Sequence, residues 1–177
     1  MNKKTVVAAA FSMLLFAGFA FSQGGSADYS GKWSLDVSKS ELGERSRIEA
    51  VDMTVEQTAD TLSVERNPKI AESGSNAAGR PPGRGMLGGG KLTYSLAGKE
   101  TKSSGGMGGE VSLRASTGDG GILKLTQVRS FNGPMGAISL TTIETWQLSA
   151  DGKTLTVTSS TETPRGNRTQ KMVFSRQ

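Results

Sequence analysis

Alternation of apolar and polar residues with a period of two is the feature that most limits how this chain can fold. From Gly31 onward the apolar runs are rich in Val, Ile, Leu and Thr, and turn-forming residues separate them. Such alternation is typical of strands that bury one face, and no segment shows the period of about 3.6 residues expected of a helix. The predicted strands are Lys32–Val37, Ile48–Gln57, Thr61–Arg66, Lys91–Leu96, Glu110–Ser116, Ile122–Phe131, Ala137–Leu148, Lys153–Thr161 and Thr169–Ser175. Closely spaced strands in one small chain predict an all-β, antiparallel barrel or sandwich.

The clearest pairing is a hairpin around Asp151-Gly152. If these two residues are the centre of a primed turn, Leu148 pairs with Leu155 and Trp146 with Val157. All four large apolar side chains then share one face, and Thr or Gln side chains occupy the other. A shift of one residue would mix both faces, so the pattern specifies the register strongly.

Polar residues continue the inward face of this hairpin, because the same register places Glu144 opposite Ser159. The preceding strand is expected to turn Leu123, Leu125, Gln127, Arg129 and Phe131 inward, since this face carries more apolar bulk than the other. Glu144 and Arg129 are therefore expected to form an interior ion pair. We interpret this pair mainly as a structural network, because a glycosidase would need a second inward carboxylate.

Composition excludes several chemistries. The chain has no Cys and no His, which removes disulfides, Cys/His zinc sites, imidazole bases and Ser-His-Asp triads. The net charge of +5 falls to +3 without Lys3 and Lys4 of the predicted leader, too little to indicate a nucleic-acid surface. No catalytic residue, metal ligand or cofactor site is assigned.

The first residues read as an export signal. Lys3 and Lys4 precede an apolar stretch that ends at Phe21, and small residues follow. This order predicts a signal peptide over residues 1–22, with cleavage after Ser22 or, as a second choice, Ala27. The stretch is short for a membrane span, so an exported protein, periplasmic or secreted, is expected. Residues 23–30 are expected to be a flexible N-terminus before a single domain over residues 31–177.

A Gly- and Pro-rich stretch over residues 67–90 differs from the rest of the domain. It has no apolar period, so it is predicted to be a mobile loop between strands. Gly83–Gly88 matches the G-x-G-x-x-G string, but Pro81-Pro82 and a strand flank it instead of a strand and a helix. A nucleotide site is therefore not expected there.

The segment Gly31-Lys32-Trp33, at the start of the first predicted strand, resembles the Gly-x-Trp motif of lipocalins in the calycin superfamily. More closely, residues 30–40 and 144–158 resemble exported bacterial lipocalin-like proteins of unassigned function. The resemblance implies a barrel in which Trp33 lies across the closed end, with a basic side chain of a late strand, here Arg176, packed on it as scaffold. Nine strands cannot close an all-antiparallel ring, so one strand is missed or split, or the first and last strands meet differently.

These observations lead to one hypothesis and two alternatives. The hypothesis is a lipocalin-like, up-and-down barrel of about 8–10 strands that binds a small apolar or amphipathic molecule in its interior. The candidate ligand-binding residues are Tyr94, Leu113, Leu125, Gln127, Arg129, Glu144, Trp146 and Val157. The first alternative is an envelope-associated module that binds a protein partner through the barrel exterior and residues 67–90. The second is a cyclase or isomerase that uses Tyr94, Glu144 and Arg129.

Overall fold

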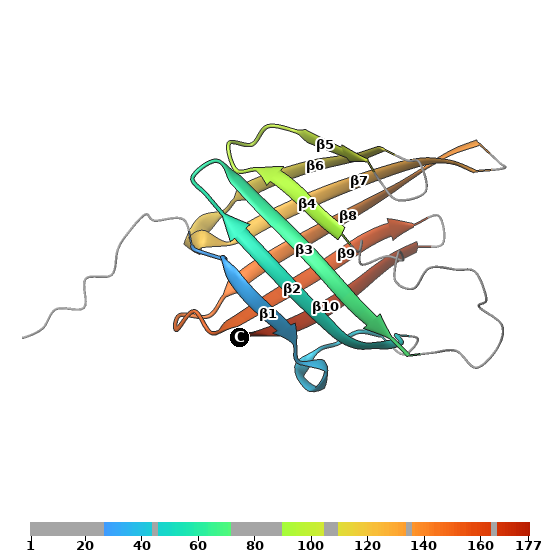
Figure 1. The fold of residues 1–177 in the computed structure, drawn as a ribbon. Helices are drawn as coiled ribbons and strands as arrows, with labels where there is room; N and C mark the ends of the chain where they lie inside the picture. Colours follow the sequence, from blue (N-terminus) through green and yellow to red (C-terminus); the bar gives the residue numbers. More distant parts are fainter. Residues whose placement is uncertain (1–26, 44–45, 72–89, 105–109, 134–135, 164–165) are drawn as a thin grey trace, which may run out of the picture.

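The protein is a single antiparallel β-barrel in the computed structural model, which describes residues 27–43, 46–71, 90–104, 110–133, 136–163 and 166–177 (Figure 1). Its strands are β1 (Gly31–Leu35), β2 (Ile48–Gln57), β3 (Thr61–Ile70), β4 (Gly90–Ser95), β5 (Thr101–Ser104), β6 (Glu110–Thr117), β7 (Leu123–Gly133), β8 (Gly136–Leu148), β9 (Thr154–Thr163) and β10 (Gly166–Arg176). Two short 3-10 turns, η1 (Val37–Lys39) and η2 (Asp119–Gly121), complete the described elements. None of the described segments is a helix with the length and apolarity that a membrane crossing needs.

The strands form one continuous sheet in the order β4-β3-β2-β1-β10-β9-β8-β7-β6-β5. Each neighbouring pair is antiparallel, and β1 pairs with both β2 and β10, so the first strand joins the last. The ends of the sheet, β4 and β5, lie beside each other (Figure 1), where the Thr101 hydroxyl donates to the Thr93 carbonyl at 2.7 Å. The barrel is therefore nearly closed, which confirms the predicted fold class.

The strand that the sequence analysis missed is β5. Its residues are Thr-Lys-Ser-Ser, so it has no apolar alternation that could reveal it. It pairs with β6 from Thr101↔Leu113 to Ser104↔Glu110. With β5 included, the strand number is even, and the difficulty of closing an odd antiparallel ring disappears.

Part of the predicted loop is strand. Residues 67–70 continue β3 and pair with β2, as in Asp52↔Asn67 and Val51↔Pro68, and Gly90 begins β4. The assignment of residues 67–70 to a loop was therefore wrong, because pairing with β2 extends the strand although these residues show no apolar period. Residues 72–89, the predicted signal peptide over residues 1–22 and the predicted cleavage after Ser22 lie outside the described residues.

The register of the β8–β9 hairpin is confirmed. The structure pairs Leu148↔Leu155, Trp146↔Val157 and Glu144↔Ser159. The turn itself is centred one residue earlier than predicted, since the Gly152 amide donates to the Ser149 carbonyl at 2.9 Å. Gly152 adopts a positive φ of 68°, which accounts for glycine at that position.

One end of the barrel interior, here called the aromatic end, is built from Tyr29, Trp33 and Arg176. Trp33 is buried, and its indole N–H donates to the Tyr29 carbonyl at 3.1 Å. The Tyr29 hydroxyl donates to the Gly121 carbonyl at 2.6 Å and also approaches the Trp146 carbonyl. Tyr29 belongs to the stretch predicted as a flexible N-terminus, so packing of the barrel begins before Gly31.

The predicted contact between Arg176 and Trp33 is present. The Arg176 guanidinium carbon lies 4.4 Å from the Trp33 ring centroid, and its Nε donates to the Gly152 carbonyl at 2.7 Å. Gly31 has a φ of 135°, and a Cβ added there would lie 2.8 Å from Arg176 Nη1. A side chain at position 31 would therefore displace the arginine from the tryptophan.

Candidate functional site

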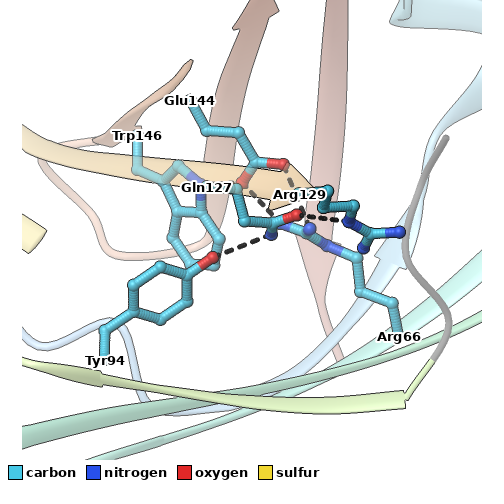
Figure 2. Close-up of polar contacts among 6 residues, drawn as sticks. All are labelled: Arg66, Tyr94, Gln127, Arg129, Glu144 and Trp146. Carbon is cyan, nitrogen blue, oxygen red and sulfur yellow. Dashed lines mark hydrogen bonds and ion pairs between the residues drawn. The ribbon is translucent and has the colours of Figure 1, made fainter. Parts of the chain in front are cut away.

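A layer of polar side chains lies inside the barrel beyond the aromatic end. This polar layer consists of Arg66, Tyr94, Gln127, Arg129 and Glu144, and Figure 2 shows it together with Trp146. Arg66 comes from β3 and Glu144 from β8, and four strands separate β3 from β8 in the sheet. Their side chains point toward each other across the barrel interior (Figure 2).

Arg66 and Glu144 form a buried, two-pronged ion pair. Arg66 Nη1 donates to Glu144 Oε1 at 3.0 Å, and Arg66 Nη2 donates to Glu144 Oε2 at 2.7 Å. Arg66 is 4% exposed and Glu144 is 5% exposed, so water screens this pair little. The parallel geometry is the one that an arginine fork and a carboxylate favour.

Trp146 connects the ion pair to the aromatic end. Its indole N–H donates to Glu144 Oε2 at 2.9 Å, and the Arg66 guanidinium carbon lies 5.6 Å from its ring centroid. The opposite contact is with Tyr29, whose ring meets Trp146 edge-on at a centroid distance of 5.8 Å. Glu144 thus accepts from both Arg66 and Trp146, which satisfies both carboxylate oxygens.

A second set of hydrogen bonds joins β4 to β7. Gln127 Nε2 donates to the Tyr94 hydroxyl at 2.9 Å, and Arg129 Nε donates to Gln127 Oε1 at 3.3 Å (Figure 2). Tyr94 and Gln127 are buried, and Arg129 is half-buried. Burial raises the pKa of the Tyr94 hydroxyl to about 12, and the Glu144 charge contributes to the same increase. Tyr94 is therefore protonated, and so a hydrogen-bond donor and acceptor, at neutral pH.

The predicted Glu144–Arg129 pair was wrong, because Arg66 is the partner of Glu144. On β7, the residue opposite Glu144 is Leu125. Arg129 lies four residues farther along β7 and pairs with Leu140, so it is displaced along the barrel from Glu144. Arg66 was missed as a site residue although a signal was present. Leu62, Val64 and Arg66 alternate along β3, and all three are buried on the inward face.

The charge state of Arg66 follows from two opposing effects. Burial disfavours the charged guanidinium, but the Glu144 charge and its hydrogen bonds outweigh burial, so the pKa of Arg66 is raised. The pair therefore consists of a cation and its neutralising carboxylate. Removing either partner would leave the other without compensation inside the barrel.

One atom of the pair has no partner. Arg66 Nε is buried and is the only buried side-chain nitrogen or oxygen among the described residues without a hydrogen bond. Buried polar atoms in folded proteins are almost always satisfied, so an exception of this kind requires an explanation. The atom belongs to the polar layer, on a side chain that extends from β3 into the barrel interior.

The structure brings the predicted ligand-binding residues together inside the barrel. The buried members of this set are Tyr94, Leu113, Leu125, Gln127, Glu144, Trp146 and Val157. Arg129 is half-buried on the same inward face, and the side chain of Phe131 lies outside the description. Contact of these residues with a ligand stays a prediction. Among the described side chains, no cluster of acidic residues is close enough to hold a metal ion.

Comparison with solved structures identifies a similar fold. The chain is similar to the zebrafish ileal bile acid-binding protein in complex with cholic acid, with 15% sequence identity and a TM-score of 0.50. The match covers 84% of this chain and 98% of the zebrafish chain. The two chains thus share the fold of an antiparallel β-barrel. No protein-family model and no curated protein matches the sequence.

Proposed function

We propose that this protein is an exported barrel that binds a small apolar or amphipathic molecule in its interior. The observation that carries the proposal is the polar layer, because it combines few polar groups with an apolar surround and includes one buried donor without a partner. Ligand sites in proteins usually have this composition, with mostly apolar walls and a small number of polar groups that fix orientation.

The strand number supports an interior site. Eight-stranded barrels are just wide enough to be filled by side chains or to hold one small ligand, and barrel diameter grows with strand number. This barrel has ten strands, so its cross-section exceeds that limit. The similar zebrafish structure holds cholic acid, which is consistent with a small-molecule ligand for a barrel of this architecture.

Export is the second part of the proposal and rests on the leader. The order of Lys3-Lys4, an apolar stretch and small residues is that of a secretory signal. The N-terminal sequence of the mature protein purified from its own host tests this assignment. Sequence starting at Gln23 is expected, and full-length protein retained with Met1 would contradict export by cleavage.

Binding is tested with Nile red, a neutral apolar dye whose emission rises in apolar surroundings. Wild-type protein is expected to bind the dye saturably with a stoichiometry of one. The control is Lys91→Ala, which removes an ion pair with Glu56 on the barrel exterior and should leave binding unchanged. Native mass spectrometry of host-purified protein then seeks a retained small molecule. Absence of saturable dye binding to folded protein would contradict the proposed function.

A further inference from the structure

The unpaired Arg66 Nε offers a way to define the polar chemistry of the ligand. Both terminal nitrogens of Arg66 are engaged by Glu144, and Nε is the guanidinium nitrogen whose N–H has no partner. A donor of this kind is satisfied by one oxygen with a free lone pair. An apolar ligand without an oxygen would bury the N–H further and leave it unpaired.

The charge around this donor decides which oxygen fits. Glu144 already neutralises Arg66, and its carboxylate binds Nη1 and Nη2, at 2.7 Å from Nη2, on the side of the guanidinium away from Nε. A carboxylate at Nε would therefore add a second negative charge to an ion pair that is already neutral, in a region that water screens poorly. A buried charge without a counter-charge of its own is costly, whereas a neutral oxygen accepts the Nε hydrogen bond without that cost.

Arg129 is the other cation of the polar layer, and its position is different. It is half-buried, it pairs with Leu140 rather than with a residue beside Glu144, and no described carboxylate lies within ion-pair distance of it. Its charge is partly exposed to water and to salt, so it does not require an anion for compensation. Arg129 therefore does not alter the charge balance of the Arg66–Glu144 pair, which remains neutral.

We propose that the buried Nε–H of Arg66 receives a neutral oxygen acceptor of the ligand, such as a ketone, ester or ether oxygen, in preference to a carboxylate. This inference rests on the proposed interior site and specifies its polar chemistry. The ligand class is thus an apolar molecule with a neutral oxygen near one end. Glu144 acts as the element that excludes anions from this position.

The test compares three probes with matched chains of eleven carbons: methyl nonyl ketone, undecane and undecanoate. Each is titrated against Nile red bound to the wild-type protein. The ketone is expected to displace the dye at about tenfold lower concentration than either of the other two, because a hydrogen bond to a charged donor contributes that much. Undecanoate as the strongest competitor, or a ketone no better than undecane, would overturn the inference.

Variants assign the effect to Arg66. In Glu144→Gln the anion-excluding charge is gone, so undecanoate is expected to gain at least about tenfold relative to the ketone. Because this variant leaves a buried cation and can fail to fold, the double variant Arg66→Met, Glu144→Leu provides a second test with an apolar replacement of the whole pair. There the advantage of the ketone over undecane should disappear, and its persistence would overturn the assignment.

Arg129→Gln separates the two arginines. It is expected to weaken undecanoate binding while the ratio between ketone and undecane stays as in the wild type. Loss of that ratio would show that Arg129, and not Arg66, provides the donor, which overturns the inference. Failure of the proposed function is distinguishable from all these results, because Nile red itself would then not bind.

Discussion

The aromatic end and the polar layer differ in the hydrogen-bond partners that their polar side chains use. At the aromatic end, Trp33, Tyr29 and Arg176 donate to main-chain carbonyls of Tyr29, Gly121 and Gly152, respectively. In the polar layer, side chains bind side chains, as in the pairs of Arg66 with Glu144 and of Gln127 with Tyr94. Main-chain partners are fixed by the sheet, whereas side-chain partners can change rotamer.

This difference indicates which region is scaffold and which can respond to a ligand. The aromatic end is fully satisfied by the fold itself. The polar layer retains one unpaired donor and therefore has hydrogen-bonding capacity that the fold does not use. Substitutions at the aromatic end should change stability alone, while substitutions in the polar layer should change stability and ligand preference together.

The largest effect is expected from Trp33→Ala at the aromatic end. Truncation of a buried tryptophan leaves a cavity and removes the Arg176 contact, so the free energy of unfolding should fall by about 5 kcal/mol. Urea unfolding followed by circular dichroism measures this change. A loss below about 1 kcal/mol would show that Trp33 is not part of the packed core.

In the polar layer, Glu144→Ala is expected to cost about 3–4 kcal/mol, because it leaves the Arg66 charge buried without a partner. The matched control is the double variant Arg66→Met, Glu144→Leu, in which both charges are replaced by apolar side chains. Its stability should lie within about 1 kcal/mol of the wild type. Equal losses in the single and double variants would contradict a compensated pair.

The raised pKa of the Tyr94 hydroxyl predicts that the protein loses stability at alkaline pH. Its pKa of about 12 in the folded protein exceeds the value of about 10 expected in the unfolded chain. As the pH rises, the Tyr94 hydroxyl therefore loses its proton first in the unfolded chain. The contribution of Tyr94 to the free energy of unfolding is fully present below pH about 10 and declines by about 3 kcal/mol up to pH about 12.

Comparison with Tyr94→Phe isolates this contribution. The variant has no hydroxyl at position 94, so its urea midpoint should decrease less steeply with pH over the same window. Parallel pH profiles for the two proteins would mean that Tyr94 ionises as easily in the barrel as in the unfolded chain.

The smallest effect is expected from Arg176→Gln. Loss of the contact with Trp33 and of the hydrogen bond to the Gly152 carbonyl should reduce stability by about 1 kcal/mol, because the guanidinium is exposed to water. Thermal unfolding measures this change, and Nile red affinity should stay constant. A change in ligand affinity would contradict the assignment of the aromatic end as scaffold.

The period-two pattern predicted most of the fold, because burial of one strand face is a local property of the sequence. It placed Trp146, Val157 and Glu144 on one inward face in the observed register. It missed β5, whose residues are all polar and which is held by its ladder with β6.

The partner of Glu144 could not be obtained from neighbouring strands. Arg66 is 78 residues away in sequence, and the two meet only because the sheet curves until β3 faces β8. Counting residues outward from a hairpin turn gives the pairs between neighbouring strands, whereas contacts across the interior depend on strand tilt and stagger around the whole barrel. The alternation of Leu62, Val64 and Arg66 was nevertheless a signal from which Arg66 could have been predicted to face inward.

The central claim, that ligand reaches the polar layer and not the aromatic end, has a direct test in one spectrum. The chain has two tryptophans, and their indole N–H groups report on different regions, since Trp146 donates to Glu144 and Trp33 to the Tyr29 carbonyl. In a ¹⁵N-labelled sample titrated with methyl nonyl ketone, the Trp146 indole cross-peak should shift saturably while that of Trp33 stays in place. A shift confined to Trp33, or no shift of either peak at saturating ketone, would contradict the account.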